Sequence, residues 1–155
     1  MPLLRAALSW NFVLATAICA SLLAQLIKVL LNLFIFHRFF AERMWGAGGM
    51  PSSHSATVCA MVVATGRYCG VNSPIFAIAA VLSIIVMYDA MGVRYETGEQ
   101  AKVLNRMFTE WMDQGFEQFQ LPHGKKLKEM VGHTPIEVVT GAALGIVLGF
   151  AMPMV

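Results

Sequence analysis

The sequence predicts an all-α fold, a polytopic membrane helix bundle with about four transmembrane helices and one interfacial amphipathic helix. Of the 155 residues, 57% are hydrophobic and only 13% are charged, whereas soluble domains of this size carry more charge. The apolar residues are concentrated in runs that approach the roughly 20 residues needed to cross a membrane. Because backbone polar groups in lipid must be satisfied internally, these runs are expected to be helices rather than strands.

Four apolar segments are the expected spans. They run from about Ser9 to Phe36, from about His54 to Cys69, from about Ser73 to Tyr88 with Gly92 as an alternative end, and from about Pro135 to Met152. The first run begins after Arg5 and continues well past the place where a signal peptide would be cleaved, so we expect a retained anchor. No internal repeat divides the chain, and residues 1–155 are predicted to form one integral membrane domain.

Basic residues are distributed unevenly between the two sides of the predicted bundle. Four spans place both termini on one side, together with Arg5 and Arg67. The opposite side carries the larger share, namely Arg38, Arg43, Arg94, Lys102, Arg106, Lys125, Lys126 and Lys128. Because Lys and Arg are enriched in cytoplasmic loops, this opposite side is expected to face the cytoplasm, in a protein of the plasma (inner) membrane.

The cytoplasmic side also contains a segment with helical apolar periodicity. Leu104, Met107, Phe108, Trp111 and Met112 fall on one helical face. This pattern predicts an interfacial helix that lies on the bilayer. Ordinary packing of the same face against the bundle is the alternative.

Cysteine usage and net charge argue against two classes of site. The cysteines Cys19, Cys59 and Cys69 are odd in number and fit no metal-ligand spacing, so they are expected to be small packing residues. The net charge is only +2, and no basic patch is interleaved with aromatic residues. Nucleic acid is therefore not an expected partner.

Two short histidine motifs each stand directly before an apolar helix. One contains Ser52, Ser53 and His54 after a glycine-rich turn, and the other contains His133 and Glu137. Free backbone N–H groups and the helix dipole favour an anion at such helix starts. Together the two motifs indicate a site that handles phosphate.

His133 and Glu137 are spaced so that one helical turn can bring the carboxylate to the imidazole. A carboxylate that accepts one ring N–H exposes the other nitrogen, and such a histidine can act as a nucleophile. The alternative for Glu137 is a capping box with Thr134, because Pro135 stands at the first helical position. The two roles coexist only if the carboxylate is shared.

Three further charged residues are candidates near these motifs. Lys28 lies within the first span, about 12 Å along the helix from its end, and should face the bundle interior with an anionic partner. Arg94 can bind phosphate bidentately, and Asp89 can orient it or Lys28. A structural ion pair is the alternative for Lys28, and a salt bridge at the membrane edge for Asp89 and Arg94.

Gly141, Gly145 and Gly149 form consecutive small-residue steps on one face of the last span. This pattern is typical of close helix packing rather than chemistry. The neighbouring helix is expected either within the chain or in a second copy, which would make a homodimer.

Three segments resemble the divergent branch of the type 2 phosphatidic acid phosphatase superfamily, which is related to acid phosphatases and vanadium haloperoxidases. They are Gly-Gly-Met-Pro-Ser-Ser-His-Ser-Ala (48–56), Tyr-Asp-Ala-Met-Gly-Val-Arg (88–94) and Gly-His-Thr-Pro-Ile-Glu-Val (132–138). The resemblance implies that His133 is the nucleophile, Glu137 its orienting carboxylate and His54 the general acid. It also implies that Ser52 and Ser53 bind phosphate, and it implies no metal or other cofactor.

The chain departs from the usual pattern of that superfamily at several positions. Ser53 replaces a glycine and Glu137 replaces an aspartate. No Arg-Pro follows Lys28 at the expected spacing, and no Ser-Arg precedes the second motif. Arg94 or Lys128 are candidates to replace the missing arginines.

The sequence therefore predicts a membrane phosphatase that hydrolyses a phosphate monoester or diphosphate of a lipid or isoprenoid through phosphohistidine. One rival is a non-catalytic binder or transporter of phosphorylated lipids on the same fold. A second rival is a Zn or Fe site built from His54, Asp89, His133 and Glu137, although their spacing matches no recognised metal motif.

Overall fold

The computed structural model describes residues 11–36, 49–114, 126–129 and 132–154. These residues form helices and no strands, in the order α2 (Phe12–Phe36), α4 (Ser53–Cys69), α5 (Pro74–Met91), α6 (Val93–Asp113) and α7 (Pro135–Ala151). Helices α2, α4, α5 and α7 occupy the four segments in which spans were expected. Ser9, the expected start of the first span, lies outside the described residues.

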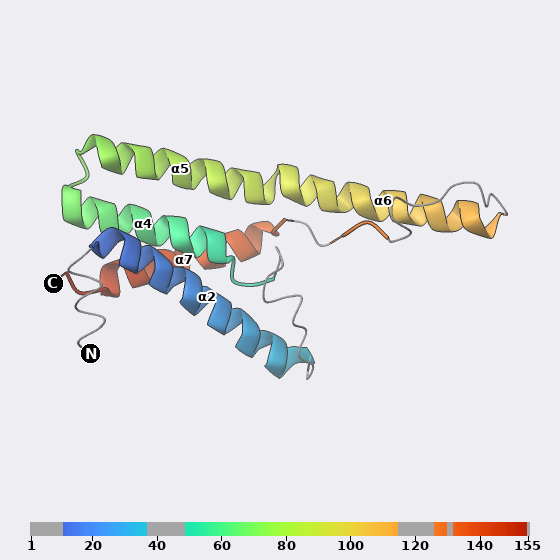
Figure 1. Ribbon diagram of the computed structural model, residues 1–155, viewed down its shortest axis with the longest axis horizontal. Helices are drawn as coiled ribbons and strands as arrows, with labels where there is room; N and C mark the ends of the chain where they lie inside the picture. The colour runs from blue at the N-terminus through green and yellow to red at the C-terminus, as the bar shows by residue number, and fades with distance from the viewer. Residues whose placement is uncertain (1–10, 37–48, 115–125, 130–131, 155) are drawn as a thin grey trace.

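The central helix is α4, which packs against α2, α5 and α7 (Figure 1). It is also the most polar of these four helices, and two of its hydroxyl groups are bonded within the helix. The Thr57 and Thr65 hydroxyls each donate to a backbone carbonyl four residues earlier, at 2.7 Å. A helix of this composition is suited to the middle of the bundle, where its neighbours shield it from lipid.

The glycine face of α7 packs against α4 of the same chain. A Cβ atom on Gly141 would overlap the carbonyl oxygen of Ser52, and one on Gly145 would overlap that of Ala56. One turn further on, a Cβ on Gly149 would press against Val63. Of the two expected neighbours, the helix within the chain is the one observed. A homodimer through this face would have to displace α4.

The glycines and alanines fix how the helices are directed. Because the α7 glycines meet α4 in sequence order, the two helices are parallel and start at the same end of the bundle. Ala20 and Ala24 of α2 pack on Ala56 and Ala60 of α4 in a core of small side chains. As Figure 1 shows, α2 and α5 run in the opposite direction, towards the end of the bundle at which α4 and α7 begin, and α2 slants away from the other helices as it ends.

The outward faces of the bundle are apolar and suited to lipid. Two helical stretches, Phe12–Phe34 and Pro74–Met112, are long and apolar enough to cross a membrane, and Pro135–Ala151 is a shorter apolar helix. Exposed residues on these faces include Leu22, Phe34, Ile78, Ile84, Val139 and Val147. The fold is therefore an all-α membrane helix bundle.

The expected amphipathic helix is present as α6, but its direction differs from the expectation. It continues the axis of α5 beyond the bundle instead of lying across the bundle end (Figure 1). The Gly92 N–H donates to Tyr88 O at 2.8 Å, and Gly92 O accepts from the Glu96 N–H at 3.0 Å. The helical hydrogen bonds therefore carry across the joint, and no loop allows α6 to turn.

Candidate active site

The two histidine motifs meet at the end of the bundle where α4 and α7 begin. The Ser52 N–H, just before α4, donates to Glu137 O in the first turn of α7 at 2.9 Å. The rings of His54 and His133 lie edge to face, with 6.2 Å between their centroids. The structure thus brings together two motifs that are 79 residues apart in sequence.

His133 is the most tightly held residue of the site. Its side chain is only 3% exposed, and its backbone N–H donates to Ala90 O of α5 at 3.0 Å. Its Nδ1 lies 3.0 Å from Oε2 of Glu137, whereas its Nε2 is buried without a hydrogen-bond partner. This is the one buried side-chain nitrogen or oxygen without a partner among the described residues.

The protonation state of His133 follows from this environment. Burial lowers the pKa of His133 below its ordinary value, and the hydrogen bond that its ring makes to Glu137 opposes that shift only in part. The ring is therefore neutral near pH 7. A neutral ring that donates through Nδ1 to the carboxylate keeps a lone pair on Nε2, which is the form a nucleophile requires.

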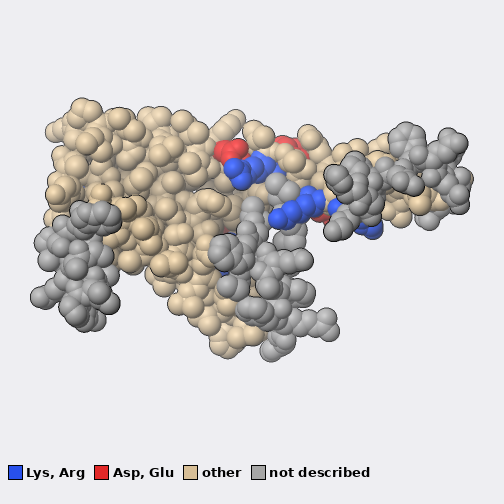
Figure 2. All heavy atoms as spheres, in the orientation of Figure 1, with Lys and Arg blue, Asp and Glu red and all other residues tan. Residues whose placement is uncertain are grey.

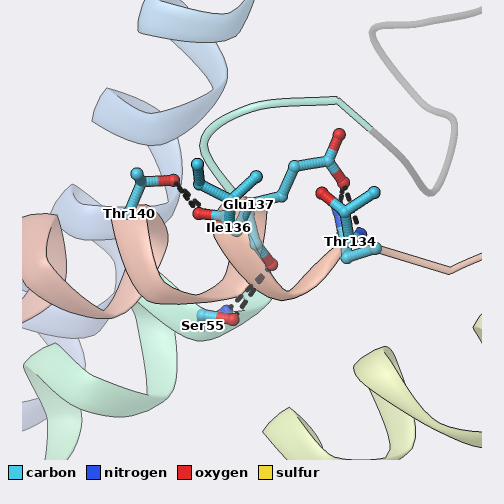
Figure 3. Close-up of polar contacts among 7 residues, drawn as sticks. Ser55, Thr134, Ile136, Glu137 and Thr140 are labelled. Atoms are coloured by element: carbon cyan, nitrogen blue, oxygen red, sulfur yellow. Dashed lines mark hydrogen bonds and ion pairs between the residues drawn. The ribbon is translucent and has the colours of Figure 1, made fainter.

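Glu137 performs both of the roles that the sequence left open. Its Oε2 accepts from the Thr134 N–H at 3.0 Å, closing the capping box of α7, and the same oxygen contacts Nδ1 of His133. Figure 3 shows this carboxylate turned back over Thr134 at the start of the helix. The shared oxygen ties the orientation of the His133 ring to the first turn of α7.

A pocket of about 40 Å³ opens beside the two histidines, enough for more than one water molecule. It is lined by His54, Val86, Asp89, Ala90, Arg94, Gly132 and His133. Nε of Arg94 donates to Asp89 at 2.6 Å, and no described residue accepts from its two terminal nitrogens. Of the candidates to replace the missing arginines, Arg94 lies at the pocket and Lys128 does not line it.

Lys28 reaches the site from α2, whereas Arg94 reaches it from the start of α6. Its side chain is 5% exposed and forms no salt bridge with a described residue, although it lies near enough to Glu137 for their charges to attract. Gly49 covers it closely, because a Cβ there would lie 3.5 Å from Cδ of Lys28. A buried ammonium with no ion pair is costly unless an anion joins it.

The two serines of the first motif have different surroundings. Ser52 is fully buried, and its hydroxyl caps α4 by accepting from the Ser55 N–H at 3.3 Å and the Ser55 hydroxyl at 3.1 Å. Ser53 and His54 open the helix, so their N–H groups have no partner within it. No described residue accepts from these two amides, so they, rather than the Ser52 hydroxyl, are available to bind an anion.

The donor atoms do not favour the metal rival. Within the described ranges, no group of three or more His, Cys, Asp and Glu side chains is arranged to hold a metal ion. Glu137 is turned towards Nδ1 of His133 and Asp89 towards Arg94. Three of the four proposed ligands are therefore already engaged, His133 and Glu137 with each other and Asp89 with Arg94.

Sequence reasoning did not recognise the role of Gly132. Its φ is +91°, and a Cβ there would overlap the backbone of Arg94 and Tyr95. Glycine is therefore required where the stretch before α7 crosses the joint between α5 and α6. The available signal was a glycine directly before the histidine of the motif.

Comparisons with known proteins agree with this architecture. A family model described as the Divergent PAP2 family matches residues 9–148. The chain is 38% identical over 144 residues to "Uncharacterized membrane protein YuiD" of Bacillus subtilis (strain 168), which covers 89% of this chain and 91% of that protein. No solved structure matches the chain significantly.

Proposed function

The chain belongs to the divergent PAP2 family, and from this premise we propose that it is a membrane phosphatase acting through a covalent phosphohistidine. Its substrate would be a phosphate monoester or diphosphate of a lipid or isoprenoid, because the site lies at one end of an apolar bundle. The observation that carries the proposal is the bare, buried Nε2 of His133 beside His54. A nitrogen without a partner in that position is poised for a ligand.

The reaction would proceed in two balanced steps. In the first, the Nε2 lone pair of His133 attacks phosphorus, the bond to the leaving oxygen breaks, and that oxygen takes a proton from His54. In the second, His54 takes a proton from water as the water oxygen attacks phosphorus. The bond to Nε2 then breaks, releasing inorganic phosphate and restoring His133.

Several groups would hold the phosphoryl oxygens. The free N–H groups of Ser53 and His54 and the dipole of α4 favour an anion at that helix start. Arg94 supplies its terminal nitrogens from the pocket wall, and Lys28 supplies buried positive charge from α2. Phosphoryl transfer depends mainly on positioning and charge stabilisation, which these groups provide without a metal ion.

A second candidate is a non-catalytic binder or transporter of phosphorylated lipids. It is favoured by one observation, that Arg94 is already engaged by Asp89 at 2.6 Å where the superfamily pattern has arginines committed to phosphate. Such a protein would keep the anion site and would not need Nε2 of His133. For either function we propose that the site faces the cytoplasm, on the evidence of the basic residues near it.

The test is phosphate release by the purified protein from a panel of lipid and isoprenoid mono- and diphosphates, with His133→Ala beside it. We expect release by the wild type, loss in the variant, and an acid-labile phosphate label on the wild type alone. Equal turnover by both proteins would overturn the mechanism. No release by either, combined with equal binding of phosphatidic acid vesicles, would establish the binder instead.

A further inference from the structure

The stretch that leads into α7 is attached along the α5–α6 rod. We call its described residues, 126–129 and 132–133, the strap. It runs against the direction of the rod, since Leu127 meets Asn105 of α6, Gly132 meets Arg94 and Tyr95, and His133 meets Ala90 of α5. The strap therefore ends at the proposed nucleophile.

Asn105 makes the outermost of these attachments. Its side chain is 4% exposed, and its Oδ1 accepts from the Leu127 N–H at 2.8 Å. Its Nδ2 donates to Leu127 O at 2.9 Å and to Glu129 Oε1 at 2.8 Å. The amide thus uses its acceptor and both of its donor hydrogens on the strap, and it pairs with Leu127 as a neighbouring β-strand would.

The inner attachments bring the strap to the site. Gly132 allows backbone to lie directly on the backbone of Arg94 and Tyr95, and the His133 N–H donates to Ala90 O at 3.0 Å. Arg94 and His133 therefore sit on two segments that are held together. Because His133 precedes the first turn of α7, the helix alone does not fix its backbone, and the strap must supply that constraint.

We propose that Asn105 is a positioning residue for His133, acting through the strap; as a statement about catalysis, this rests on the proposed function. Asn105 touches neither the pocket nor the histidine. By holding Leu127 and Glu129 on α6, it would keep His133 in place at the pocket that His54 and Arg94 also line. The amphipathic helix α6 thereby serves as the rigid support to which the segment that carries His133 is anchored.

The expected effect follows from the sensitivity of catalysis to geometry. A displacement of about 1 Å at a reacting atom can lower a rate by about 100-fold. We expect Asn105→Ala to lower kcat by about tenfold or more, with little change in KM, because the phosphate-holding groups on α2 and α4 are not attached to the strap. A residue that only stabilised α6 would lower the melting temperature and leave kcat per folded molecule unchanged.

The experiment compares Asn105→Ala with Arg106→Ala in the full-length protein. Arg106 is the neighbouring residue, 82% exposed, and pairs with Glu110 on the same helix without touching the strap. Phosphate release gives kcat and KM, and hydrogen exchange is followed on peptides covering 126–133. Asn105→Ala should accelerate hydrogen exchange across these peptides as far as the His133 N–H, and it should leave exchange in α4 unchanged. In Arg106→Ala, exchange should be the same as in the wild type throughout.

A reciprocal exchange of groups tests the clasp, by which we mean the hydrogen bonds of Asn105 to Leu127 and Glu129. Asn105→Asp alone places two carboxylates together and should lower kcat at least as far as Asn105→Ala. Adding Glu129→Gln returns a donor to that pair, since Gln at 129 can donate to Asp at 105, and should restore part of the loss. Failure of the double variant to improve on Asn105→Asp would overturn the role of the clasp.

The outcomes separate this proposal from the phosphatase proposal. If hydrogen exchange in Asn105→Ala rises at 127–129 but not at His133, or does not rise at all, the positioning role of Asn105 is overturned, whether or not the protein is active. If the wild type releases no phosphate, the phosphatase proposal is rejected, and the positioning role of Asn105 is still tested by the exchange data. In that case the exchange data, together with faster modification of His133 by diethyl pyrocarbonate in Asn105→Ala, decide whether Asn105 positions this histidine.

Discussion

The two ends of the bundle use a cation in opposite ways. At the far end, Arg67 donates to Gly149 O at 2.6 Å and Met152 O at 2.7 Å, and its guanidinium lies 5.5 Å from the centre of the Phe12 ring. At the site end, Lys28 is 5% exposed and has no salt bridge among the described residues. Arg67 thus supplies hydrogen bonds to carbonyls at the end of α7, whereas no such carbonyl partner is described for Lys28.

The difference shows how a small bundle separates stability from function. Arg67 satisfies carbonyls that the end of α7 leaves without helical partners. At the other end, Nε2 of His133 is buried without a partner, the first amides of α4 have no partner within the helix, and Lys28 has no salt bridge with a described residue. On the face drawn in Figure 2, most of the described charged side chains that are visible lie at the joint between the bundle and α6 and along α6. Unsatisfied polar groups are costly and are retained where a ligand completes them.

The sharpest way to break this comparison is to remove Lys28. Lys28→Met is expected to lower kcat/KM by about 10²- to 10³-fold, the usual loss when one charge-stabilising group is removed. The melting temperature in detergent should stay the same or rise, because a buried cation without an ion pair is replaced by an apolar chain of similar length. A variant that unfolds at lower temperature but keeps its activity would show that Lys28 is structural.

Arg67→Met is the matched change at the other end. It leaves the carbonyls of Gly149 and Met152 without their donor, and we expect a loss of roughly 2 kcal/mol in the free energy of unfolding. The kcat of the folded fraction should equal that of the wild type. Thermal unfolding and phosphate release measured on the same sample check both points, and a lower kcat with unchanged stability would abolish the contrast between the ends.

The pH dependence sharpens the role assigned to His133. Because its pKa is lowered, the neutral ring persists below the ordinary histidine value, and the acid limb of kcat/KM is expected below about pH 6.5. Glu137 raises that pKa, so Glu137→Gln should move the limb to still lower pH and reduce kcat by about 10- to 100-fold. A limb that moves towards neutral pH would contradict the pairing.

The same shift has a consequence for stability. The unfolded chain binds a proton at His133 at a higher pH than the folded protein does. The contribution of neutral His133 to the free energy of unfolding is therefore fully present above about pH 6.5, and it declines as the pH falls towards the pKa of His133 in the folded protein. The pH dependence of the melting temperature, compared with that of His133→Ala, measures this contribution, and parallel curves would contradict it.

A further substitution tests the contact that aligns the two helix starts. Gly145→Ala would force a Cβ against Ala56 O, and we expect it to lower the free energy of unfolding by about 1–3 kcal/mol. Activity should fall with it, because a shift of α7 on α4 separates His54 from His133. Val147→Ala, on the exposed face of the same helix, is the control and should change little.

The site was predictable where its geometry is local. A histidine before an apolar run lies at a helix start whatever the tertiary fold, and the spacing of His133 and Glu137 puts their side chains within reach of each other. The hydrophobic spans were equally accessible, since membrane crossing depends on length and composition. The pairing of the two histidines was expected from topology, which places both motifs on one side of the bundle.

Other features depend on contacts between distant segments. The glycine pattern of α7 predicted close packing but did not distinguish α4 from a second copy. The sharing of one Glu137 oxygen between helix cap and histidine depends on a rotamer. The clasp of Asn105 on Leu127 joins residues whose separation in sequence carries no local signal.

Taken alone, the amino-acid sequence establishes the helices, their membrane setting and the placement of both histidine motifs at one end, because these follow from hydrophobic length, backbone hydrogen bonding and the chemistry of helix starts. The direction of α6, the separate sides from which Lys28 and Arg94 approach, and the bare Nε2 of His133 arise only in the folded protein. They depend on which groups meet across helices, and an unpaired atom is defined by everything packed around it.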